Sequence, residues 1–237
     1  MEKIDWLIKK SKILLKKNNF QKSEAILAKS LPLIRIYGTS DFVKRKIEIL
    51  NTLSCCSRRT GNLKQSIDYL QQALRFGKST KENLGLTYVN LTAVYSELGD
   101  YTTALKMSKE SIFELSQAAL VDKDQQLMKM LLIAYYNNGS MEINLRKYQN
   151  GIKVLEKGKE LVRKYQIIED EGIVDNITEK LAEARNKFIN QTRSYNSSPL
   201  KNNSRDNTVH KSGKRGSSSG QQNTNRIFSN GNTLRER

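Results

Sequence analysis

The sequence has only one histidine, two cysteines and two prolines among its 237 residues. His210 lies in a polar C-terminal segment, so the rest of the chain has no histidine for a catalytic triad or a metal site. Cys55 and Cys56 are adjacent, so they form neither a disulfide framework nor a C-x-x-C zinc motif, and we expect buried thiols. We therefore expect no enzyme, no metal and no cofactor.

A phosphate-binding loop is also missing. The stretch GKST at 77–80 resembles the end of such a loop, but the earlier glycine that the motif requires is replaced by Gln72. We expect a connecting loop here instead, in which Ser79 caps the next helix and Glu82 completes a capping box.

Long apolar runs are missing as well. No stretch approaches the roughly 18–20 apolar residues that cross a bilayer. The N-terminal segment contains Glu2 and Asp5 and no apolar run of signal-peptide length. We expect no membrane span and a cytoplasmic, reducing location, while the oligomeric state stays open.

Positive charge is in excess, with a formal net charge of +17. Residues 192–237 hold nine Lys/Arg against two Asp/Glu, so this segment and the first 191 residues are both basic. A basic surface favours an acidic partner: an acidic peptide, an anionic membrane surface or nucleic acid. Charge that only keeps the protein in solution is the alternative interpretation.

The chain changes character near residue 192. Residues 192–237 contain nine Ser and eight Asn with few large apolar residues, so they bury too little surface to offset their ordering entropy. We predict a disordered basic tail there. Residues 1–191 indicate helix throughout, because Pro32 is their only proline and no alternating strand pattern of useful length occurs.

One spacing template recurs four times in residues 1–191. A small residue is followed nine residues later by a large apolar one, then by small residues after three and seven more. The four sets are Ser11, Phe20, Ser23, Ser30; Ser54, Leu63, Ser66, Ala73; Thr92, Tyr101, Ala104, Ser111; and Gly139, Tyr148, Gly151, Gly158. Turn-forming pairs precede three of the large residues: Asn18-Asn19, Gly61-Asn62 and Gly99-Asp100.

The template indicates pairs of closely packed helices. Small residues on both helices let the backbones approach, and the large residue fills the gap near the turn. Each pair leaves an apolar face that only a neighbouring pair covers, so we expect the units to stack.

This pattern resembles the tetratricopeptide repeat. The best match is residues 85–118, through Leu91, Tyr95, Gly99, Tyr101 and Ala104, although Thr92 and Ser108 depart from the usual residues. Further units are expected at 4–37, 47–80 and 132–165. The resemblance implies an all-α, right-handed α-solenoid of about four helical hairpins. The second-helix positions 23, 66, 104 and 151 lie more than 34 residues apart, which is similar to the long repeats of kinesin light chains and spindle-orientation scaffolds.

A capping helix is expected at 174–191. Val174, Ile177, Leu181, Ala184 and Phe188 share one face at helical spacing, and the opposite face is charged. Such a helix covers the last repeat on one side and meets water on the other. A membrane-binding amphipathic helix is the less favoured alternative, because Glu179 and Glu183 lie on the polar side.

In this family the first helices of successive pairs line a concave face that binds peptides. The resemblance implies that Asn90 and Asn137 hydrogen-bond the backbone of an extended ligand, since an amide both donates and accepts. Other side chains expected on this face are Lys9, Lys12, Lys16, Asn51, Thr52, Arg58, Arg59, Tyr136 and Ser140. A lysine or arginine there is otherwise a solvated charge, and Tyr136 is otherwise a packed residue.

Two functions fit these patterns. The favoured one is a non-enzymatic interaction scaffold or adaptor that holds an extended acidic or polar segment of another protein. The alternative is a nucleic-acid-associated protein that uses the basic tail and body. It is less favoured because the tail has no recognition motif, and its only aromatic residues are Tyr195 and Phe228.

Overall fold

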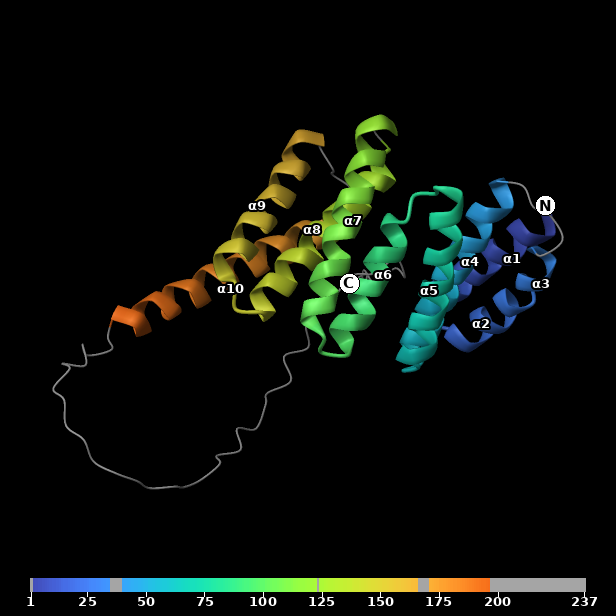
Figure 1. The fold of residues 1–237 in the computed structure, drawn as a ribbon, viewed down its shortest axis with the longest axis horizontal. Coiled ribbons are helices and arrows are strands. Elements are labelled where there is room, and N and C mark those ends of the chain that lie inside the picture. Colours follow the sequence, from blue (N-terminus) through green and yellow to red (C-terminus); the bar gives the residue numbers. More distant parts are fainter. Residues whose placement is uncertain (1, 35–39, 123, 166–170, 197–237) are drawn as a thin grey trace, which may run out of the picture.

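The computed structural model describes residues 2–34, 40–122, 124–165 and 171–196, and these ranges are helical with short turns. The helices are α1 (Glu2–Lys16), α2 (Phe20–Ala28), α3 (Leu31–Ile34), α4 (Ser40–Arg59), α5 (Leu63–Thr80), α6 (Gly85–Glu97), α7 (Tyr101–Asp122), α8 (Gln125–Asn144), α9 (Tyr148–Tyr165) and α10 (Glu171–Asn196). They form one array with α1 near one end and α10 at the other (Figure 1). The predicted α-solenoid is confirmed.

Four helical hairpins build the array, and each second helix begins at the large residue of the sequence template. The hairpins are α1–α2, α4–α5, α6–α7 and α8–α9. Their second helices begin at Phe20, Leu63, Tyr101 and Tyr148. The large residue therefore marks the start of the second helix in every unit.

The turn inside each hairpin has the same geometry. The residue two positions before the second helix has a positive φ in all four units: Asn18 (55°), Gly61 (84°), Gly99 (78°) and Arg146 (60°). Two backbone bonds close each first helix, as where the Arg146 amide donates to the Ile143 carbonyl and the Lys147 amide to the Glu142 carbonyl. This is the Schellman helix ending, which needs a left-handed residue. Arg146 supplies it without the glycine or asparagine that marked the other three turns.

Small residues of the template meet where the two helices of a hairpin cross. The Ser66 hydroxyl oxygen lies 2.7 Å from that of Ser54 and 3.0 Å from the Ser54 carbonyl oxygen. The Ser23 hydroxyl likewise donates to the Ser11 carbonyl at 3.1 Å. In the last hairpin a Cβ added at Gly139 would lie 2.5 Å from Leu155 Cγ. The close approach predicted from the template is therefore the packing that the structure shows.

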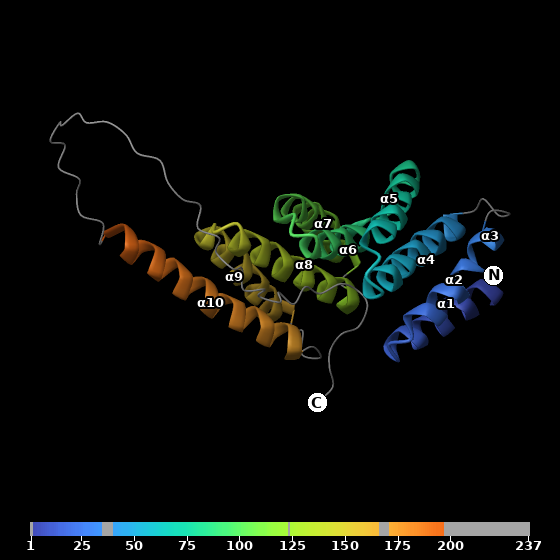
Figure 2. The same cartoon turned by 90° about the horizontal axis from the view of Figure 1, so that it is seen from below.

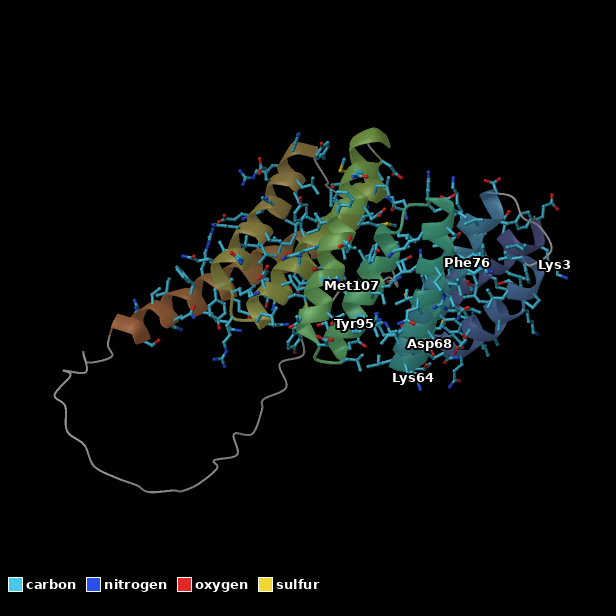
Figure 3. The ribbon with its side chains drawn as sticks, in the orientation of Figure 1. Lys3, Lys64, Asp68, Phe76, Tyr95 and Met107 are labelled. Carbon is cyan, nitrogen blue, oxygen red and sulfur yellow. The ribbon has the colours of Figure 1, made fainter. Side chains whose placement is uncertain are left out.

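Apolar side chains from neighbouring hairpins form the core between them. Leu70 of α5 and Leu91 of α6 belong to one cluster, against which Tyr95 and Met107 pack from α6 and α7 (Figure 3). Leu132 and Leu155 of the last hairpin form another with Ile177 of α10. Each hairpin is thus stabilised chiefly by burial against its neighbours.

The extra length of these repeats is taken up mostly by longer helices. α7 has 22 residues and α8 has 20, whereas α6 has 13.

The stretch GKST forms the last residues of α5, so the prediction of a loop at 77–80 is wrong. The Ser79 hydroxyl donates to the Phe76 carbonyl, and Lys81 ends the helix in the left-handed conformation. The next helix has Leu84 at its N-cap, so the predicted capping box does not form.

α10 covers the last hairpin. Ile177, Leu181 and Ala184 are buried against α8 and α9, while Glu183 pairs with Lys180 and Lys187 on the polar side. The helix begins before and ends after the expected range 174–191, because it includes Ile173 in its apolar face and extends to Asn196. Residues 192–196 of the predicted tail belong to it, and 197–237 lie outside the described residues.

Replacing Arg146 by glycine should stabilise the protein. Arg146 is exposed and has a positive φ. This left-handed backbone conformation costs an arginine more free energy than it costs a glycine. We expect the free energy of unfolding to rise by about 0.5–1 kcal/mol, measured by urea denaturation. The reciprocal change Gly99→Arg, at a position with no atom near a new Cβ, should lower it by a similar amount. Loss of stability in Arg146→Gly would contradict this account of the turn.

Candidate functional site: a groove on the first helices

The first helices of the four hairpins share one side of the array. α4, α6 and α8 lie side by side, with α5 and α7 on the other side of them (Figure 2). A hollow of about 420 Å³ crosses these helices and α1. It is lined by Lys12, Leu15, Lys16, Glu48, Asn51, Thr52, Cys55, Leu86, Asn90, Gln126 and Met130. Side chains from four helices therefore converge on one groove.

Hydrogen bonds between α4 and α6 form the floor of this groove. The Asn51 amide donates to Thr87 Oγ1 at 3.0 Å and to the Ile47 carbonyl at 3.1 Å. The Asn90 amide donates in turn to Asn51 Oδ1 at 3.0 Å. The Cys55 thiol lies 3.8 Å from Asn90 Oδ1. Asn51 and Asn90 are at most 4% exposed, so these bonds join the two repeats as well as forming a polar floor.

The α1 side of the groove carries charge. Lys12 Nζ lies 2.5 Å from Glu48 Oε1, and both side chains are substantially exposed. Lys16, one turn further along α1, is exposed in the same groove. Outside the groove, the Arg45 guanidinium bonds both oxygens of Asp5 and lowers the pKa of that carboxyl, which links α4 to α1. The groove thus has a positive end with one acidic side chain.

The two predicted arginines lie outside the hollow. Arg58 is 7% exposed and forms an ion pair with Glu97 at the end of α6, so its guanidinium joins α4 to α6. Arg59 is exposed, and partial desolvation together with the charge of Arg58 lowers its pKa. Arg58 was expected to be open on the concave face, but stacking brings Glu97 to it and leaves it buried.

The predicted residues of α8 also lie outside this hollow. Tyr136 is 3% exposed and packs in the cluster that α8 and α9 form with α10. Asn137 and Ser140 are at most 1% exposed. These side chains were expected on an open face, but they are buried. α10 contributes to the burial of Tyr136. Lys9 is exposed two turns before Lys16 on the same side of α1, but it does not line the hollow.

Gln126 and Met130 were not expected in the groove. The predicted fourth unit began at residue 132, whereas α8 begins at Gln125. The additional turns carry both side chains to the hollow. Glu48 was also missed, although the sequence carries a signal for it. It lies one turn before Thr52 on the same face of α4, and helical spacing alone identifies that position.

A second hollow, of about 660 Å³, lies between α9 and α10. Lysines and arginines dominate its lining, and Arg185 of α10 pairs with Glu156 of α9 at 3.0 Å. Most of these charged side chains are exposed, so this is an open basic surface rather than a built site.

Two kinds of site do not occur in the described ranges. No helix there combines the length and the apolar character needed to cross a membrane. No group of three or more His, Cys, Asp or Glu side chains in the same ranges is placed to hold a metal ion.

Comparisons with known proteins agree with this architecture. Residues 47–76 match the family model of the tetratricopeptide repeat, beginning at the residue where the second predicted unit begins. The structure resembles the nearly identical TPR-like repeats of a protein assigned as a kinesin light chain in Podosopora anserina, with a TM-score of 0.62 at 12% identity, covering 81% of this chain and 90% of that one. It also resembles BtubC (BKLC) from P. vanneervenii, with a TM-score of 0.56 at 13% identity and 85% of each chain covered. No curated protein matches the sequence.

The fold and the matched repeat together define a tetratricopeptide-type α-solenoid. The chain carries such a repeat at residues 47–76, and the predicted resemblance to the long repeats of kinesin light chains is confirmed at the level of the fold. Repeats of this type indicate a protein–protein interaction scaffold.

Replacing Asn51 by alanine should destabilise the protein. The change removes a donor to Thr87 and the acceptor of the buried Asn90 amide, so both partners lose a hydrogen bond. We expect the free energy of unfolding to fall by about 1–3 kcal/mol in urea denaturation. Asn186→Ala, on the exposed side of α10, is the matched control and should change little. Equal effects of the two changes would show that the groove floor does not join the repeats.

Proposed function

We propose that the chain is a non-enzymatic scaffold whose groove binds an extended, acidic or polar segment of another protein. The observation that carries the proposal is the convergence of four first helices on a groove with two lysines at one end and amides along its floor. An extended segment that crosses α1, α4, α6 and α8 would contact all four repeats at once. A cytoplasmic setting is part of the same proposal.

The polar floor offers hydrogen bonds to such a segment. The Asn51 amide group uses both of its N–H donors inside the protein, whereas the Asn90 amide group donates one to Asn51. Its second N–H suits a peptide carbonyl lying in the groove. Thr52 and Gln126 add hydroxyl and amide groups beside it, and Leu86 and Met130 add apolar contact.

The lysines favour a carboxylate on the ligand. Lys12 is held by Glu48, so an acidic ligand side chain has to compete with Glu48 for it. Lys16 extends the positive end by one turn. We therefore propose that Glu48 lowers the affinity of the groove for anions in general. It favours ligands whose acidic group is positioned to displace Glu48 from Lys12.

The test is a titration with a fluorescently labelled, glutamate-containing extended peptide and its glutamine counterpart. The double change Lys12→Gln and Lys16→Gln should weaken binding of the glutamate peptide about 5- to 20-fold, and Glu48→Gln should strengthen it a few-fold. Lys64→Gln with Lys78→Gln, two exposed lysines on α5, removes the same charge and is the control that should leave binding unchanged (Figure 3 labels Lys64).

Two outcomes would contradict the proposal. Equal weakening by the double change at Lys64 and Lys78 and by the double change at Lys12 and Lys16 would mean that net charge alone drives binding. Tight binding of single-stranded RNA that falls steeply with salt and ignores the groove variants would favour the nucleic-acid function instead. Circular dichroism of each variant controls for folding.

A further inference from the structure

A second surface of α1 carries the only tryptophan of the sequence. Trp6 is 56% exposed and Ile13, two helical turns further on, is 47% exposed. The seven-residue spacing places both on one side of the helix, opposite the buried Ile4, Leu7 and Ser11. Of the two lysines that line the groove, Lys16 lies next to this side of the helix and Lys12 lies further round it.

Lysines surround the two apolar side chains. The helical period puts Lys9 on one side of Trp6 and Ile13, and Lys3, Lys10 and Lys17 on the other, all exposed. Lys10 Nζ lies 4.5 Å from the centroid of the Trp6 ring. We call these six residues the Trp6 face. Of the two acidic residues of α1, Asp5 is bound to Arg45, whereas Glu2 is exposed within this face, one turn before Trp6, and offsets one of the four lysine charges.

The two ends of the array differ. At one end α10 covers the last hairpin and turns a charged side to water. Near the other end α1 packs on α2 and α4 (Figure 2). Its Trp6 face is uncovered among the described residues. Terminal units of a solenoid normally have a polar outer side, so a half-exposed tryptophan and isoleucine there indicate a binding surface.

Charge decides what fits on this surface. A second copy would bring the same lysines face to face. Residues 197–237 contain eight Lys/Arg against two Asp/Glu, so this segment is repelled as well. The occupant must therefore be anionic.

Shape favours a membrane over an acidic protein. Anchor side chains in protein interfaces fill pockets, but Trp6 and Ile13 project from a single helix and line neither of the two hollows described above. A membrane interface needs no pocket: tryptophan inserts at the headgroup level, and lysines extend to the lipid phosphates.

We propose that the Trp6 face docks α1 flat on an anionic membrane surface. Trp6 and Ile13 enter the headgroup region, while Lys3, Lys9, Lys10 and Lys17 pair with lipid phosphates and carboxylates. The helix lies on the membrane and does not cross it. Because the groove begins at Lys16, next to this face of α1, a ligand segment would be held next to the lipid surface.

Trp6 is also the reporter for the experiment. The full-length protein is mixed with vesicles of phosphatidylcholine containing phosphatidylserine at about one third, or of phosphatidylcholine alone, and bound protein is measured by flotation. We expect binding to the anionic vesicles only, with a blue shift of tryptophan emission. The triple change Lys9→Gln, Lys10→Gln and Lys17→Gln should lower the partition constant on the order of 100-fold.

The apolar contribution is tested by Trp6→Ala with Ile13→Ala, which should lower flotation at least about tenfold. Phe113→Ala, at a side chain on α7 that is 58% exposed, is the matched control and should bind as the unchanged protein does. Flotation without a blue shift, or flotation that survives the Trp6 and Ile13 changes, would overturn the proposal and assign binding to other basic residues. A blue shift with an acidic polypeptide but not with vesicles would overturn it in favour of a protein partner.

Discussion

The close crossing of the two helices in each hairpin is the constraint on which the rest of the structure depends. At Ser54 and Ser66 a hydroxyl bonds the neighbouring main chain, and at Gly139 and Gly151 a Cβ added to either residue would lie 3.3 Å or less from the carbonyl oxygen of the other. The crossing aligns each hairpin so that its apolar side faces the next one. Stacking then places the first helices in a row, and the groove lies on that row. The groove is therefore a consequence of how small residues pack inside the hairpins.

The groove and the network beneath it combine two roles. Asn51 and Asn90 join α4 to α6 and also line the surface, so the same buried amides stabilise the stack and shape the proposed binding site. Glu48 acts in the opposite direction, because it occupies Lys12 and reduces the positive charge that a ligand meets. α1 contributes to two surfaces, with Lys12 and Lys16 in the groove and Trp6 and Ile13 on the Trp6 face. If both proposals hold, the protein would bring a protein segment to a lipid surface.

The template in the sequence was enough to predict the hairpins and a large residue near each turn, because small-large spacing directly reflects the crossing. Three turns were visible through Asn18, Gly61 and Gly99, whereas the turn at Arg146 carries no such signal. Helix length was harder, since a template anchored near the turn says little about the far end of a helix. That is why Gln126 and Met130 were missed. The ion pair of Arg58 could not be predicted, because Glu97 is distant in sequence and only stacking brings the two together.

The central claim is that close helix crossing, rather than intrinsic helix preference, determines stability in these hairpins. The most direct measurement is the free energy of unfolding of Gly139→Ala in urea. At an unobstructed helix position this change should raise stability by roughly 0.5–1 kcal/mol. We expect the free energy of unfolding to fall by about 1–3 kcal/mol instead, because the new Cβ would lie 2.5 Å from Leu155 Cγ and 3.3 Å from the Gly151 carbonyl oxygen. A gain in stability would contradict the claim.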